Sequence, residues 1–114
     1  MKIFLICPVR DADAKHSRSE MVYVKSLENE GHDVHWPPRD TDQMADGISI
    51  CRQNMEAIRN AEEIHIFYNS KSQGVHFDMG MAFALGKKIV VVKNEPYGEG
   101  KSFPRMLDEL SKRV

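Results

Sequence analysis

The sequence predicts an α/β fold in which a mostly parallel sheet lies between two layers of helices. Three short apolar runs, at residues 2–7, 64–68 and 89–92, are typical of strands that helices cover on both faces. Stretches of helical spacing separate them, so strand and helix alternate along the chain. Such alternation is typical of a parallel sheet with helical crossovers. The 114 residues are expected to form one domain, spanning 1–114.

The N-terminal half is expected to contain two strands and two helices. We predict strands at 2–7 and 32–36 and helices at 17–30 and 48–60. Ser17 and Glu20 have the spacing of a capping box, and Gly31 is suited to end the first helix. Residues 32–36 alternate between polar and apolar side chains, which favours a strand at the edge of the sheet.

The C-terminal half centres on residues 70–92, which are expected to form a loop, a helix, a turn and a strand. Apolar residues occur nearly all round this helix, which predicts that it is buried on every side. Asp78 is placed in its first turn, where backbone N–H groups and the helix dipole favour an anion. Ser102 and Pro104 then mark the start of a last helix, at 103–113.

Few layouts are consistent with these elements, because parallel crossovers are right-handed and short. With the alternating second strand at an edge, the expected strand order is 2-1-3-4, possibly with a fifth strand. This is a short form of the flavodoxin-like (Rossmann-like) three-layer sandwich, in which ligands bind where the chain leaves two neighbouring strands in opposite directions. The loops at 8–17 and 69–78 flank that crevice, so Arg10 and Asp78 are expected to face it together.

Composition and motifs exclude several classes of function. The net charge is −1, so no strong field points to nucleic acid or an anionic membrane as a partner. No apolar run reaches bilayer length and the N-terminus lacks a signal-peptide pattern, so we expect a cytoplasmic protein. The glycine motifs of dinucleotide and P-loop sites are missing. The histidines lack the spacing of a metal site, so neither a metal nor a cofactor is expected.

Three segments resemble the nucleoside 2-deoxyribosyltransferase family, which includes deoxynucleoside 5′-monophosphate N-glycosidases and CMP hydrolases. They are KIFLICPVR, QNMEAIRNAEEIHIFY and SQGVHFDMGMAFALGKKI. The resemblance implies a flavodoxin-like fold and cleavage or exchange of the N-glycosidic bond of a nucleoside or nucleotide. It also implies a homodimer or higher homo-oligomer. Because residues 89–92 would form an exposed apolar edge, we expect a partner subunit or the last helix to cover them.

The resemblance also implies a set of site residues. Asp78 stands at the position of the family's nucleophilic glutamate, and Asn54 at that of a second carboxylate. Phe4 falls where the family has an aromatic hydroxyl. The expected substrate-binding residues are Phe4, Pro8, Arg10, Ser72 and Gly74, with Arg10 and Ser72 at the family's phosphate-binding positions.

The loop PRDTDQ contributes two further candidates. Asp40 and Gln43 either contact the base or belong to a surface turn, and we interpret Arg39 as a solvated loop charge.

A carboxylate suits glycosidic chemistry because it stabilises or traps the oxocarbenium character that develops on the sugar. Two readings of Asp78 remain open: an ionised group held beside a ligand, or a charge that only complements the helix end. In the second case its removal is expected to cost about 0.3–1 kcal/mol. The same sequence is also consistent with a nucleotide-binding or sensing domain of little turnover, since Asp is shorter than Glu and Asn54 cannot act as an acid.

Overall fold

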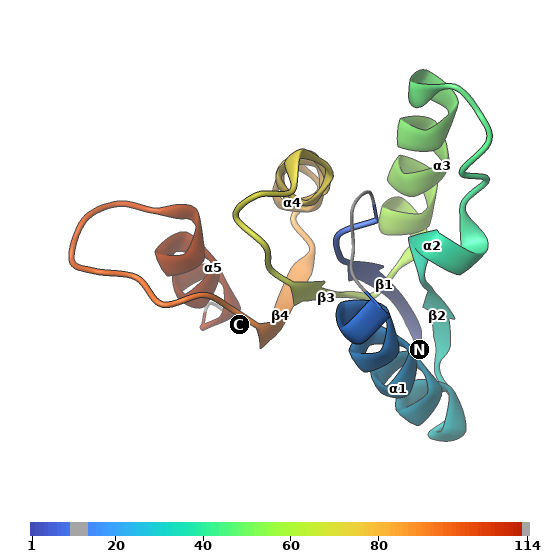
Figure 1. Ribbon diagram of the computed structural model, residues 1–114, viewed down its shortest axis with the longest axis horizontal. Helices are drawn as coiled ribbons and strands as arrows, with labels where there is room; N and C mark the ends of the chain where they lie inside the picture. The colour runs from blue at the N-terminus through green and yellow to red at the C-terminus, as the bar shows by residue number, and fades with distance from the viewer. Residues whose placement is uncertain (10–13, 113–114) are drawn as a thin grey trace.

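A computed structural model describes residues 1–9 and 14–112 of the chain (Figure 1). Four strands form one sheet in the order β2-β1-β3-β4, and every neighbouring pair is parallel. The strands are β1 (Lys2–Ile6), β2 (Asp33–His35), β3 (Glu63–Phe67) and β4 (Lys88–Lys93). This confirms the expected order with β2 at an edge, and no fifth strand occurs within the described residues.

The helices cover the sheet in two layers. They are α1 (Ala14–Asn29), α2 (Pro37–Asp40), α3 (Gly47–Asn60), α4 (Gln73–Ala84) and α5 (Phe103–Ser111). Figure 1 shows α3 and α4 on one side of the sheet and α1 on the other, which is the three-layer arrangement expected from right-handed crossovers. None of the helices in the described part of the chain is long and apolar enough to cross a membrane.

Strand alternation divides the core into two clusters, one on each face of the sheet. Phe4 and Ile6 of β1 point toward α3 and α4, whereas Ile3 and Leu5 point toward α1. Because side chains alternate along a strand, β1 is buried on both faces. The carboxyl end of β1 is thereby fixed in the middle of the sheet, between the ends of β2 and β3.

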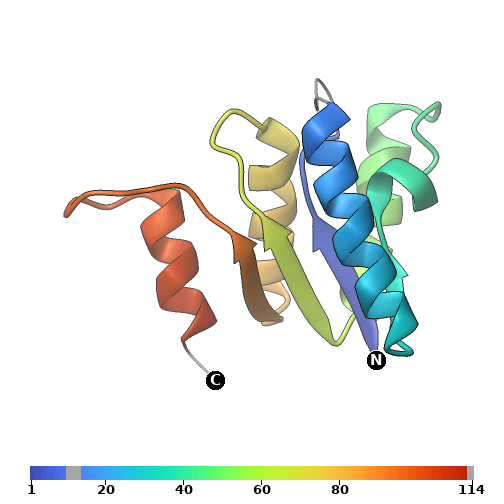
Figure 2. The same cartoon turned by 60° about the horizontal axis from the view of Figure 1, so that its bottom comes forward.

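The second edge of the sheet is packed against α5. Figure 2 shows this helix beside β4 at the end of the sheet. Leu107 of α5 is fully buried in the same cluster as Ile89, and Met106 packs against that cluster together with Val91. The last helix therefore provides the cover that the apolar run at 89–92 requires.

Several helix ends agree with the sequence and one does not. Gly31 and Gly86 adopt positive φ values of 95° and 66° after α1 and α4, and Ser102 caps α5 by accepting a hydrogen bond from the backbone N–H of Arg105. The capping box of Ser17 and Glu20 is wrong, because α1 already includes Ala14. Glu20 is instead buried, and its Oε1 accepts from Nε1 of Trp36 at 3.1 Å.

The central helix α4 differs from the prediction in two respects. Ser72 is its N-cap, with Oγ accepting from the backbone N–H of Val75 at 3.2 Å, so Asp78 lies in the second turn and not the first. The helix is also not buried on every side, since Phe77 and Phe83 are 57% and 62% exposed. One face packs on the sheet through Val75 and Met79 while the other remains apolar and exposed.

Candidate functional site

A cavity of about 710 Å³ opens at the carboxyl ends of β1 and β3. Its walls come from the segment after β1, from α3, and from the loop and first turns of α4. It is lined by Cys7, Val9, Gln43, Ile50, Cys51, Asn54, Lys71, Ser72, Gln73, Gly74, Phe77 and Asp78. The chain leaves β1 and β3 toward opposite faces here, which is the position where open α/β sheets bind ligands.

Asp78 of α4 and Asn54 of α3 face each other in this cavity. Both side chains are nearly buried, each with 8% of its surface exposed, and both line the same cavity. Burial raises the pKa of Asp78 from 3.8 to about 7, and the polar Asn54 side chain offsets part of that rise. Asp78 lies one turn beyond the helix N-terminus that was expected to favour an anion, and desolvation is the largest influence on its pKa.

The predicted entry residues also lie at the cavity. Ser72 and Gly74 line it beside Lys71, which is exposed just before α4. Gln43 lines the opposite wall, where its Nε2 donates to the backbone carbonyl of Pro37 at 2.8 Å. The structure thus brings Gln43, Ser72 and Gly74 together with the pair of Asn54 and Asp78.

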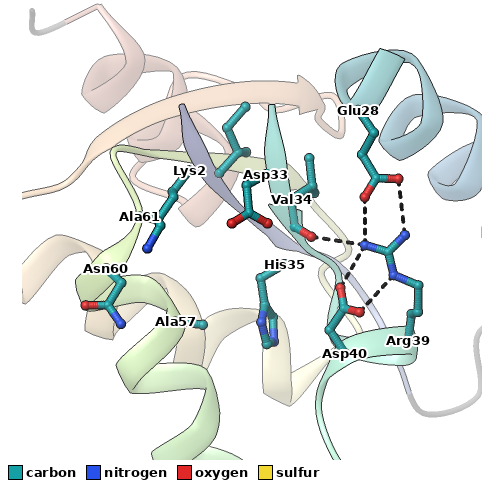
Figure 3. Close-up of a pocket in the computed structure, with 11 residues that line it drawn as sticks. Lys2, Glu28, Asp33, Val34, His35, Arg39, Asp40, Ala57, Asn60 and Ala61 are labelled. Atoms are coloured by element: carbon teal, nitrogen blue, oxygen red, sulfur yellow. Dashed lines mark hydrogen bonds and ion pairs between the residues drawn. The ribbon is translucent and has the colours of Figure 1, made fainter. Parts of the chain in front are cut away.

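Three other predicted residues lie elsewhere. Phe4 is fully buried in the core and Pro8 is buried beneath the surface, and neither lines the cavity. Asp40 lines a different pocket, of about 400 Å³, beside β2 (Figure 3). Arg10 lies outside the described residues, so its place at the crevice stays a prediction.

Arg39 and Asp40 form a local ion network beside β2. Figure 3 shows the Arg39 guanidinium between Glu28 and Asp40, with donor–acceptor distances of 3.0 and 3.2 Å to Glu28 and 2.8 Å from Nε to Asp40. Arg39 also donates to the carbonyl of Val34 at 3.0 Å. Arg39 is exposed, as expected of a solvated charge, and its guanidinium is also paired with two carboxylates.

Sequence reasoning missed several lining residues, above all Cys7, Lys71 and Phe77. The signal for Cys7 was available, since it directly follows β1 and must reach the switch point. Burial raises the pKa of its thiol, and the nearby Glu20 carboxyl raises it further. Phe77 belongs to the helix that was expected to be buried on every side, but its side chain is exposed and lines the cavity.

A profile described as nucleoside 2-deoxyribosyltransferase matches residues 3–107. The chain belongs to this family. The match includes the four strands except Lys2 at the start of β1, and it contains both Asn54 and Asp78.

Solved structures of the family share the fold. A CMP N-glycosidase from Clostridium botulinum superposes with a TM-score of 0.64 at 23% identity, over 97% of this chain and 83% of that one. A 2-deoxyribosyltransferase from Bacillus psychrosaccharolyticus gives 0.72 at 19% identity, over 96% and 82%. A 2-desoxiribosyltransferase from Leishmania mexicana gives 0.61 at 23% identity, over 82% and 65%. No curated protein matches the chain.

The raised pKa of Asp78 has a consequence for stability. Between pH 3.8 and about 7 the Asp78 carboxyl keeps its proton in the folded chain and loses it in the unfolded chain. The free energy of unfolding therefore falls as the pH rises through this range. We therefore predict that Asp78→Asn stabilises the protein at pH 8 by a few kcal/mol, roughly, rather than costing the small amount expected of a helix-end charge.

Denaturant unfolding at pH 5 and pH 8 measures this effect, and the stabilisation should shrink toward pH 5. Asp46→Asn is the matched control, because Asp46 is an exposed N-cap whose pKa is lowered by hydrogen bonds from Ser49, so no stabilisation is expected. A loss of stability in Asp78→Asn at pH 8 would contradict the account.

Proposed function

We propose that this protein cleaves or transfers the N-glycosidic bond of a nucleoside or nucleoside 5′-monophosphate, with Asp78 as the carboxylate that acts on the sugar. Family membership supports the reaction class. The observation that carries the role of Asp78 is its place: among the described residues that line the switch-point cavity, it is the one carboxylate, and an amide donor faces it.

The chemistry follows from the surroundings of this carboxyl group. As the bond to the base breaks, its electron pair leaves with the base and positive charge develops on the sugar. Ionised Asp78 stabilises or traps that charge, and the Asn54 amide stabilises the ionised form. Ile50 and Phe77 supply apolar walls against which a base or sugar can pack. Water or a second base then attacks the sugar carbon, which gives hydrolysis or transfer.

The phosphate of a monophosphate substrate would fit the entrance to the cavity. Lys71 supplies a positive charge there, and the first turn of α4 begins directly after it with Ser72 as the N-cap. Backbone N–H groups at a helix N-terminus favour an anion. Gly74 leaves this turn without a side chain that would block the approach. Arg10 is a further candidate for the same anion from its position in the sequence.

The second candidate function is a nucleotide-binding or sensing domain of little turnover. Two observations favour it: Asn54 carries no acidic proton, and Phe4 is buried in the core without a hydroxyl group. Both functions would use the same cavity, so the release of free base is what separates them.

We predict that the wild-type protein releases free base from at least one member of a panel of nucleosides and their monophosphates, and that Asp78→Asn abolishes release while substrate still binds. The amide preserves size but removes the charge on which the transition state depends. Because the pKa of Asp78 is about 7, kcat/KM should rise as the pH rises through that value.

Chromatography of the free base measures release, and calorimetry measures binding. Glu56→Gln, an exposed carboxylate of α3 outside the cavity, serves as the control. Release by Asp78→Asn at the wild-type rate would rule out the catalytic role. A wild type that binds nucleotide without releasing base would favour the binding domain.

We also infer that the protein forms a homodimer in the cytoplasm. Three large apolar side chains are exposed in segments that contribute to the cavity: Phe77, which lines it, and Met44 and Ile48, which are close in sequence to Gln43 and Cys51. Isolated exposed apolar residues are common, but a group of large ones beside a ligand site is typical of an interaction surface. A second copy of the chain is the partner that the family resemblance favours.

Light scattering tests this assembly directly. We expect the mass of a dimer at micromolar concentration, and we expect Ile48→Glu to shift it toward the monomer by placing a charge in the interface. Val22→Glu, at an exposed apolar position on α1, is the matched control and should leave the mass unchanged. A wild-type protein that is monomeric at micromolar and higher concentrations would contradict the proposed dimer.

A further inference from the structure

A chain of hydrogen-bonded side chains leads from the edge of the sheet to Asp78. Thr41, which directly follows α2, is buried between β2 and α3. Its Oγ1 lies 2.7 Å from Oδ1 of Asn54 and 2.8 Å from Nε2 of His35. Asn54 lines the same cavity as Asp78 and favours the ionised form of its carboxyl group, so the hydrogen-bonded side chains of His35, Thr41 and Asn54 end beside Asp78.

The chemistry of these groups sets the direction of the chain. Oδ1 of Asn54 lies against the Thr41 hydroxyl, so Nδ2–H is the group left to face Asp78, where it favours the ionised carboxylate. An amide oxygen only accepts, and a hydroxyl has one proton to donate. Thr41 therefore donates to Asn54, and Nε2 of His35 donates to Thr41.

His35 is held in place for this role. Its ring stacks on Phe4 with centroids 5.2 Å apart and planes 10° from parallel. Burial lowers the pKa of His35, which favours the neutral ring, and donation to Thr41 then selects the tautomer that carries its proton on Nε2. The charged groups that act on the ring are Asp33, Arg39 and Asp40. The other titratable groups at the cavity, among the residues described, are Cys7, Cys51 and Lys71.

We propose that Thr41 is a positioning residue for the reaction at Asp78: with His35 behind it, the hydroxyl holds the Asn54 amide with Nδ2–H toward the carboxylate. Without this hydrogen-bond donor the amide can turn by half a rotation and present its oxygen to Asp78. Two acceptors would then face each other in a buried site, which disfavours the ionised carboxylate. The role in the reaction rests on the function proposed above, whereas the coupling between Thr41 and Asp78 does not.

The first test compares the pH profile of base release in Thr41→Val and Thr41→Ser. Valine keeps the shape of the side chain and removes the hydroxyl, whereas serine restores it. We expect Thr41→Val to move the rising limb of kcat/KM upward by about one pH unit, as the loss of a hydrogen bond to a charged group implies. Thr41→Ser should return the limb toward the wild-type position. A uniform loss of rate at every pH, with no shift of the limb, would overturn the proposal.

The second test needs no turnover, so it separates this proposal from the proposed function. Unfolding equilibria at pH 8 are measured for wild type, Thr41→Val, Asp78→Asn and the double variant. We expect the penalty of Thr41→Val to be about tenfold larger in the unfolding constant when Asp78 is present than in the Asp78→Asn background. Equal penalties in both backgrounds would overturn the proposal, whatever the assay for base release shows.

A second variant keeps the proposal open to contradiction if Thr41→Val does not fold. His35→Phe preserves an aromatic ring against Phe4 and removes the donor to Thr41. We expect His35→Phe to move the rising limb of kcat/KM to higher pH, as Thr41→Val does but by less. Its penalty in the unfolding constant should also be larger with Asp78 present than in the Asp78→Asn background. An unshifted pH profile of kcat/KM, together with no coupling to Asp78 in the unfolding equilibria, would overturn the proposal.

Discussion

The burial of the Asp78 carboxyl against the Asn54 amide, where α3 meets α4, is the interaction on which the rest of the site depends. It follows from the topology of the sheet. The crossover through α3 and the crossover through α4 lie on the same face, while α1 returns on the other (Figure 1). The two helices therefore pack side by side over the carboxyl ends of β1 and β3, and side chains at their contact face the switch point.

Burial in this arrangement disfavours the ionised carboxylate that the proposed reaction needs. A carboxyl group with a pKa near 7 is poised between its two forms at neutral pH, as is common for groups that act on substrates. Asn54 reduces the conflict because its neutral polar side chain favours the ionised form of Asp78 without adding a second negative charge. The amide of Asn54 is thus consistent with a site built around one carboxylate.

The sequence predicted the sheet well because its signals are local and strong. Alternation at residues 32–36 placed β2 at an edge, and the apolar runs placed β1 and β3 inside. The start of α4 was misplaced because an apolar helix has no periodicity that separates its faces, so the turn of Asp78 and the exposure of Phe77 were both missed. Glu20 was misassigned because its partner, Trp36, lies in another element.

The central claim is that Asp78 is a buried carboxyl group whose ionisation occurs near neutral pH. Carbon NMR of labelled aspartate side chains, with the Asp78 resonance assigned by its absence from Asp78→Asn, measures this directly. A titration midpoint near pH 7 is the expected result, since burial raises the pKa to about that value. A midpoint near pH 4, typical of an exposed aspartate, would contradict the account.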